Sequence, residues 1–268
     1  MDTAPEISGS LVVGSGEAAR RIAYESRDGE GPALVWLGGY RSDMRGTKAE
    51  HLCRLAAENG LASCRLDYSG HGESGGRFED GTISRWVEEA AAVLAAAVDK
   101  PAILVGSSMG AWIALRLVQR ARAARGGTPI VGLLLLAPAP DFTRRLMEPQ
   151  LTPAQRQELV DNGFLSEPSA YSDAPTIYTQ ALFADGAANL VMEGPIETGC
   201  PVTIIQGMAD PDVPFQHALD LVSHLPSDGV VVTLVRDGDH RLSRPRDLQL
   251  IERAALDLVA AARDAGTA

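Results

Sequence analysis

The chain has 268 residues, of which 45% are hydrophobic and 22% are charged, a composition typical of a globular protein and within the length that one α/β domain supports. Its formal net charge of −11 excludes a nucleic-acid-binding role, because no surplus of cations is available to neutralise phosphates. No run of about 20 apolar residues occurs, so we expect no membrane span.

The N-terminal part of the chain predicts the cellular location of the protein and the first element of its structure. Residues 1–9 contain neither a basic nor an apolar targeting segment, so we expect a cytoplasmic protein. Two short alternating segments follow at residues 10–14 and 20–26, with the turn residues Gly14, Ser15 and Gly16 between them. This arrangement predicts an antiparallel hairpin at the start of the fold.

From residue 33 onward, short apolar runs alternate with amphipathic helical patterns. Apolar runs of this length are typical of strands that helices bury on both faces. The alternation predicts a doubly wound, mostly parallel sheet, which has about eight strands when the hairpin is included. The expected strands are 33–37, 61–66, 102–105, 131–136, 202–205 and 230–235, and the expected helices are 47–58, 83–98, 109–125, 216–225 and 246–262.

The interval 140–199 interrupts this alternation. Prolines and glycines separate short helical pieces such as 153–160, and no strong strand pattern is present. A long excursion between two sheet strands is usually functional. We expect a small cap over the strand ends, where open α/β sheets bind ligands, inserted in a single domain that spans residues 1–268.

The pattern G-x-S-x-G occurs at residues 72–76 and again at residues 106–110. As a nucleophile motif it requires a strand that runs into a sharp turn and then a helix, because this geometry lifts the hydroxyl out of the sheet. Ser108 lies in that context, between the strand 102–105 and the next helix. Ser74 lies in a glycine-rich loop well past its strand. We therefore predict Ser108 as the nucleophile and Ser74 as a loop residue.

The general base is expected after the last strand, because the chain order in this motif class is serine, acid, histidine. His240 follows the strand 230–235 on the polar turn Asp237–Asp239, where its imidazole can reach the serine. The other histidines either lie in helical patterns or precede Ser108 in a glycine-rich loop: His51, His217, His224 and His71.

A carboxylate that orients the histidine completes the triad. Asp210 follows the strand 202–205 and is the leading candidate. Asp212 is close enough to compete, and Asp141 follows the strand 131–136, which is another place from which an acid can come. The residues alone leave these two alternatives open.

The oxyanion hole is expected to use two backbone N–H groups. One belongs to Met109, directly after the nucleophile, and the other to Tyr40 in the loop after the first buried strand, where Gly38 and Gly39 let the backbone approach a ligand. The spacing of the three cysteines is not that of metal ligands, and acyl transfer through a serine requires no cofactor. We therefore expect neither a metal nor a cofactor.

Several segments together carry a family resemblance, and Gly46-Thr47-Lys48-Ala49 is the most specific of them. The chain resembles the α/β-hydrolase superfamily along nearly its whole length. Within it, the chain is similar to the mitochondrial abhydrolase-domain palmitoyl-protein thioesterases, also known as mycophenolic acid acyl-glucuronide esterases, and to their bacterial relatives. The matching segments are 39–49, 67–74, 105–112, 206–214 and 239–241.

The resemblance implies the α/β-hydrolase fold, the triad Ser108, Asp210 and His240, and Tyr40 with Met109 as oxyanion donors. It implies hydrolysis of an ester or thioester, carried by a small molecule or an acylated protein, without fixing the acyl group. A peptidase, a carbon–carbon bond hydrolase and a non-catalytic ligand-binding protein of the same fold are the alternatives. The first strand is not preceded by a basic amphipathic transit segment, which favours a bacterial cytosolic relative.

Two arginines adjoin the expected site. Arg41 follows Tyr40 and Arg241 follows His240, so both are expected at the rim of the pocket. An arginine there can bind an anionic substrate group through two parallel hydrogen bonds. The alternative is that the two arginines neutralise nearby acids such as Asp43 and Asp239.

Overall fold

The computed structural model describes residues 4–124, 127–168, 174–226 and 228–266. Eight strands form one sheet, and all of them coincide with segments expected from the apolar runs and the N-terminal hairpin. They are β1 (Glu6–Val13), β2 (Arg20–Arg27), β3 (Glu30–Leu37), β4 (Leu61–Leu66), β5 (Ala102–Ser107), β6 (Ile130–Leu136), β9 (Val202–Gly207) and β10 (Val230–Val235).

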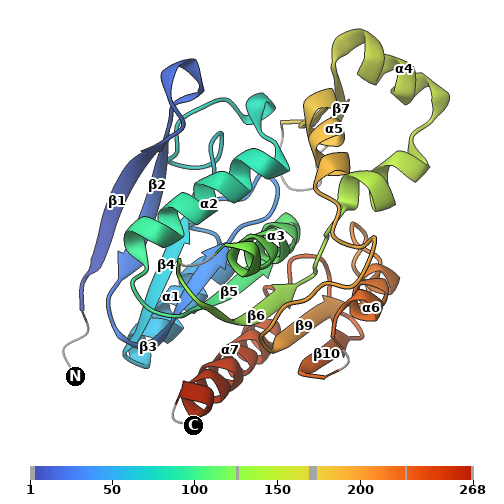
Figure 1. The fold of residues 1–268 in the computed structure, drawn as a ribbon. Helices are drawn as coiled ribbons and strands as arrows, with labels where there is room; N and C mark the ends of the chain where they lie inside the picture. Colours follow the sequence, from blue (N-terminus) through green and yellow to red (C-terminus); the bar gives the residue numbers. More distant parts are fainter. Residues whose placement is uncertain (1–3, 125–126, 169–173, 227, 267–268) are drawn as a thin grey trace.

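The strand order is β1-β2-β4-β3-β5-β6-β9-β10 (Figure 1). The pairs β1–β2 and β2–β4 are antiparallel, and the remaining neighbours are parallel. The carboxyl ends of β3, β5, β6 and β9 therefore meet at one edge of the sheet. The predicted doubly wound, mostly parallel sheet is confirmed.

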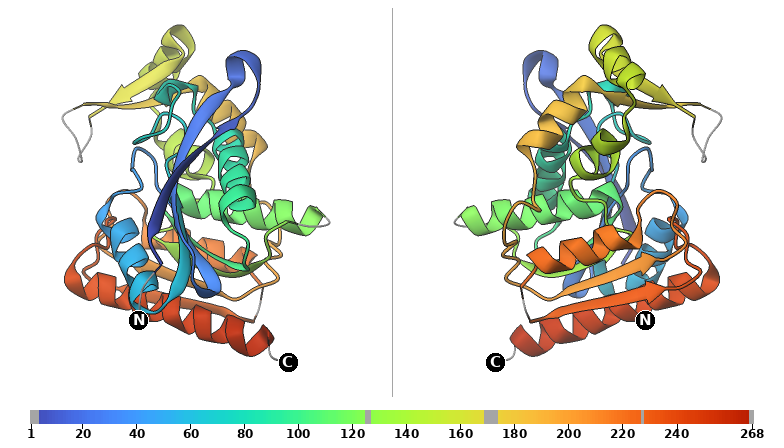
Figure 2. Two further views of the ribbon diagram at one scale, coloured as in Figure 1. Left: turned by 90° about the vertical axis from the view of Figure 1, so that its left-hand side faces the viewer. Right: turned by 90° about the vertical axis from the view of Figure 1, so that its right-hand side faces the viewer.

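Helices cover both faces of the sheet because successive strand residues point to opposite sides. Val35 packs in the core beneath α2, α3 and α6, whereas Leu34 packs in the core beneath α1 and α7. Figure 2 shows the sheet between α3 and α7. The helices are α1 (Thr47–Glu58), α2 (Ile83–Ala97), α3 (Met109–Ala123), α6 (Phe215–His224) and α7 (Pro245–Gly266), and short 3₁₀ turns occupy Gly16–Ala18 and Phe78–Asp80.

Residues 140–199, called the insertion from here on, extend beyond the end of β6 (Figure 1). They contain a hairpin of two four-residue strands, which the sequence did not predict because neither strand carries an apolar run. The predicted helix 153–160 is present and two residues longer. The elements are a π-helical turn (Thr143–Met147), a 3₁₀ turn (Glu148–Gln150), α4 (Pro153–Asn162), β7 (Phe164–Glu167), β8 (Thr176–Thr179) and α5 (Gln180–Ala188).

Buried polar contacts join the two ends of the insertion to each other and one of these ends to α3. The fully buried carboxylate of Asp141 accepts hydrogen bonds from the N–H groups of Val191 and Met192, at 2.9 and 2.8 Å. Trp112 on α3 donates from Nε1 to the carbonyl of Asn189 at 2.9 Å. These bonds fix where the insertion leaves the sheet and where it returns. Within the described residues, no helix is both long and apolar enough to cross a bilayer.

Candidate active site

Ser108 occupies a sharp turn between β5 and α3. Its φ of 55° and ψ of −118° lie in a region that residues with a Cβ rarely adopt, a kind of backbone strain concentrated at functional sites. Both flanking glycines are needed for the turn. A Cβ at Gly110 would lie 2.0 Å from the carbonyl oxygen of Leu37, and a Cβ at Gly106 would lie 2.5 Å from the carbonyl oxygen of Gly110.

Ser74, the serine of the other G-x-S-x-G match, connects a strand to a loop instead. Its hydroxyl donates to the carbonyl of Asp67 at 2.6 Å and accepts from the N–H of Ala23 at 2.8 Å. These bonds join β2 to the loop after β4. Both roles of the hydroxyl are thereby used in backbone contacts, as expected of a loop residue that stabilises the fold.

The structure brings Ser108, His240 and Asp210 together from three separate loops. His240 Nε2 lies 3.1 Å from Ser108 Oγ, and His240 Nδ1 lies 2.8 Å from Asp210 Oδ2. A carboxylate only accepts hydrogen bonds, so Nδ1 carries the proton and Nε2 is free to accept the serine proton. The Asp210 side chain is fully buried and that of His240 is 17% exposed. The arrangement is that of a nucleophile, a base and an orienting acid.

The Asp210 carboxylate is saturated with donors. Oδ1 accepts from the N–H groups of Asp212 and Val213, and Oδ2 accepts from Gln206 Nε2 in addition to His240. Burial acts to raise the pKa of Asp210, but the hydrogen bond and charge of His240 and the two backbone donors hold that pKa below its ordinary value. Asp210 therefore stays ionised where it can stabilise an imidazolium.

The two alternative acids lie in different surroundings. Asp141 binds the backbone of the insertion, as described above, and burial raises its pKa. Asp212 is exposed beside the triad, and one ligand atom from each of Asp210, Asp212 and His240 lies within 4.8 Å of the others. These three residues are the group in the described chain that could hold a metal ion. In the geometry observed, however, His240 Nδ1 is bound to Asp210.

Hydrogen bonds clamp the loop that carries His240. The N–H of Ala209 donates to the carbonyl of Gly238 at 2.9 Å, which joins this loop to the one that carries Asp210. Lys48, on the first turn of α1, donates from Nζ to the carbonyl of Arg241. Burial and the Arg241 guanidinium lower the pKa of Lys48 to about 8, against the opposing charges of Asp239 and Asp247. Sequence reasoning singled out the segment of Lys48 without assigning it a role.

The loop after β3 places its backbone next to Ser108. A Cβ at Gly39 would lie 3.3 Å from Ser108 Cβ, so the chain at this point can approach a substrate carbonyl on Ser108. Tyr40 follows, and Met109 begins α3 on the other side of the serine. The side chain of Tyr40 faces the insertion, where its hydroxyl donates to the carbonyl of Ile177 at 2.6 Å and its ring stacks on Tyr178.

The two rim arginines differ in their contacts. Arg41 donates from Nη1 to the carbonyl of Pro175, and its guanidinium carbon lies 5.5 Å from the centre of the Phe78 ring. Arg41 thus connects the β3 loop to the residue that directly precedes β8. Arg241 is exposed and lies close enough to Lys48 for the two positive charges to repel.

Comparisons with known proteins place the chain in a family. Residues 32–252 match the model of the alpha/beta hydrolase family. The human palmitoyl-protein thioesterase ABHD10, described as mitochondrial, is 33% identical over 239 residues, which cover 89% of this chain and 76% of the human one.

Solved structures agree with this assignment. A candidate hydrolase of Agrobacterium vitis is 56% identical with a TM-score of 0.94, and the match covers 95% of this chain and 99% of that one. Mouse alpha/beta hydrolase domain-containing protein 10 is 27% identical with a TM-score of 0.82, over 94% of this chain and 99% of the mouse chain. The family model, the curated relatives and the observed sheet agree, and the chain belongs to the α/β hydrolase family.

Proposed function

We propose that this chain is a serine hydrolase that cleaves a carboxylic ester or thioester through an acyl-enzyme on Ser108. The observation that carries the proposal is the continuous hydrogen-bonded line from Ser108 Oγ to His240 Nε2, at 3.1 Å, and from His240 Nδ1 to Asp210 Oδ2, at 2.8 Å. The strained backbone of Ser108 supports it, because such strain persists only where the surrounding structure enforces it.

In the proposed mechanism His240 Nε2 takes the Ser108 proton while Oγ attacks the carbonyl carbon. The N–H groups of Tyr40 and Met109 hold the oxyanion of the tetrahedral intermediate. His240 then gives its proton to the departing alcohol or thiol, which leaves the acyl group on Ser108. Water, deprotonated by His240, attacks this acyl-enzyme and releases the carboxylic acid. Asp210 stabilises the imidazolium in both half-reactions, and no metal or cofactor takes part.

The proposed substrates are acyl thioesters and esters, with the acyl group on a small molecule or on a protein. The mammalian relatives carry the name palmitoyl-protein thioesterase, which favours a long acyl chain. An acyl-glucuronide is the alternative ester substrate. A cytoplasmic location stays a prediction, since these relatives are described as mitochondrial.

A substrate panel tests the proposal directly. We expect hydrolysis of p-nitrophenyl esters and acyl-CoA thioesters with a clear optimum in chain length, measured as kcat/KM for each length. Turnover of thioesters above esters of the same acyl chain would identify a thioesterase. Cleavage confined to peptide or carbon–carbon substrates would contradict the proposal, as would saturable binding of acyl-CoA with no turnover, which is the behaviour of a binding protein.

The rim arginines lead to a second expectation, on esters that carry an anionic group. Arg241 and Lys48 place two positive charges close together beside His240, so an anion bound there relieves their repulsion. A charge-assisted hydrogen bond contributes about 1.5–3 kcal/mol, so Arg241→Ala should lower kcat/KM about tenfold for an anionic ester and little for a neutral one. The contacts of the Arg41 guanidinium with Pro175 and Phe78 limit how far it can turn toward an anion, so Arg41→Ala should lower kcat/KM for the anionic ester by less than about tenfold.

The control for this pair is Arg54→Ala, which removes an exposed arginine that pairs with Glu58 on α1. Added salt should narrow the difference between the anionic and neutral esters, because salt screens exposed charges. Equal losses on both esters in Arg241→Ala would mean that the arginine stabilises the loop and does not bind substrate.

A further inference from the structure

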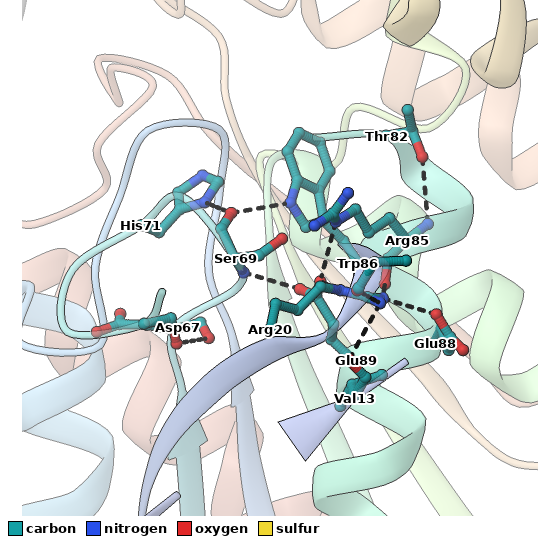
Figure 3. A network of polar contacts seen from close by, with 12 residues as sticks. Val13, Arg20, Asp67, Ser69, His71, Thr82, Arg85, Trp86, Glu88 and Glu89 are labelled. Carbon is teal, nitrogen blue, oxygen red and sulfur yellow. Dashed lines mark hydrogen bonds and ion pairs between the residues drawn. The ribbon is translucent and has the colours of Figure 1, made fainter. Parts of the chain in front are cut away.

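A line of buried polar contacts leads from α2 toward the loop after β3 (Figure 3). It starts at Glu89, whose carboxylate is fully buried on α2. The buried Arg20 donates from Nε to Oε1, and the N–H of Ser69 donates to Oε2 at 2.8 Å. A buried carboxylate paired with a buried arginine is costly to disrupt. It therefore holds Ser69, in the loop after β4, at a fixed position.

The carbonyl of Ser69 in turn orients two rings. Trp86 Nε1 donates to it at 3.3 Å, and His71 Nδ1 lies 3.1 Å from it (Figure 3). Because a carbonyl oxygen only accepts, the proton of His71 is on Nδ1 and Nε2 of the neutral ring is an acceptor. Burial lowers the pKa of His71 to about 4, so the ring is neutral near pH 7.

The free acceptor of His71 is used by the loop next to the nucleophile. The backbone N–H of Arg41 donates to His71 Nε2 at 3.2 Å. Arg41 has a φ of 59°, in the left-handed region that residues with a Cβ avoid. The hydrogen bond thus stabilises the peptide group at Arg41 in a backbone conformation that a residue with a Cβ disfavours. Tyr40 immediately precedes this peptide, and Gly39 before it lies against Ser108.

We propose that His71 is a positioning residue for acyl transfer, which holds the Arg41 peptide and thereby keeps the Tyr40 N–H aimed at the oxyanion on Ser108. The inference rests on the proposed function, because the Tyr40 N–H has this role only if Ser108 forms a tetrahedral intermediate. His71 acts through Arg41 and contacts neither Ser108 nor His240 in the hydrogen bonds described. Its loss should therefore weaken the transition state more than the binding of substrate.

The test replaces His71 with phenylalanine, which retains an aromatic ring for the edge-on contacts with Phe78 and Trp86 but removes both nitrogens. Misplacement of a catalytic group by about 1 Å costs roughly 100-fold. We expect His71→Phe to lower kcat by about 10- to 100-fold on the best p-nitrophenyl ester, with KM changed by about twofold at most. The affinity for a trifluoromethyl ketone, which forms an oxyanion adduct with serine, should fall by the same factor as kcat.

Two further variants separate positioning from general stability. His71→Gln can accept from Arg41 and donate to Ser69, whereas His71→Asn is too short to span both, so we expect kcat of the glutamine variant to be about tenfold higher. If His71→Phe does not fold, the difference in kcat between the glutamine and asparagine variants still tests the proposal. Thr82→Val removes the N-cap hydrogen bond of α2 without touching His71. It should lower the melting temperature and leave kcat near the wild-type value.

Three results would overturn the inference. They are wild-type kcat in His71→Phe, equal kcat in the glutamine and asparagine variants, and a fall in kcat for Thr82→Val that matches that of His71→Phe. A wild-type protein that hydrolyses no member of the substrate panel would instead overturn the proposed function. The two failures are therefore distinguishable in one set of assays.

Discussion

Asp210→Asn should lower kcat by about 10⁴-fold and leave the fold intact. The reason lies in the four hydrogen bonds to this side chain. The backbone N–H groups of Asp212 and Val213 both donate to Oδ1, so the amide oxygen of an asparagine takes that position. The amide NH₂ then replaces Oδ2 and faces His240 Nδ1. Because an NH₂ group only donates, Nδ1 must accept and the imidazole proton moves to Nε2. Nε2 then faces Ser108 Oγ as a donor and cannot accept the serine proton.

The two alternative acids serve as matched controls for this variant. Asp141→Asn should leave kcat near the wild-type value but lower stability, because the Asp141 carboxylate binds the N–H groups of Val191 and Met192 at the end of the insertion. Asp212→Asn should change kcat little, since its side chain is exposed. The measurements are kcat on one ester and urea unfolding. If Asp212→Asn or Asp141→Asn loses activity while Asp210→Asn remains near wild type, the acid has been assigned to the wrong residue.

The largest effect is expected for Ser108, the proposed nucleophile. Ser108→Ala should lower kcat by about 10⁶-fold, the size of loss found when a triad serine is removed. KM and the melting temperature should change little, because the hydroxyl contributes its hydrogen bond to His240 alone among the contacts described. The residual rate measures what the oxyanion donors and binding contribute without covalent catalysis.

Ser74→Ala is the control, since this serine occurs in the same pattern of glycines. It should retain kcat and lose stability, because the Ser74 hydroxyl bonds both Ala23 and Asp67. The two variants are thus expected to show opposite patterns of activity and stability. Loss of activity in Ser74→Ala with a stable fold, and retention of it in Ser108→Ala, would reverse the assignment.

The sequence predicted the sheet well because its signals are local. Each apolar run between 33 and 235 became a strand, and α1 and β4 have the predicted limits. The β7–β8 hairpin was missed because its strands are short and partly exposed, so no apolar alternation marks them. The helix end expected at residue 125 lies outside the described residues; α3 is observed to end at Ala123.

The triad candidates could be named because the motif fixes their order along the chain. The supporting contacts could not, because they join residues far apart in the sequence. Lys48 reaches the carbonyl of Arg241, 193 residues away, and His71 reaches the N–H of Arg41, 30 residues away. Neither contact can be recognised from hydrophobic periodicity or from the spacing of a motif in the sequence. Arg41 shows the same limit, since its position suggested anion binding while its observed partners are Pro175 and Phe78.

The central claim is that Ser108 forms the covalent intermediate, and labelling with a fluorophosphonate tests it most directly. Such a probe phosphonylates a serine only when a neighbouring base activates it. Tryptic digestion separates the peptides of Ser108 and Ser74, and fragment ions distinguish Ser108 from Ser107. We predict one label per chain, on Ser108, with activity lost in proportion to labelling and no label in His240→Ala. A label on Ser74 or Ser107, or an unlabelled protein that hydrolyses esters, would contradict the account.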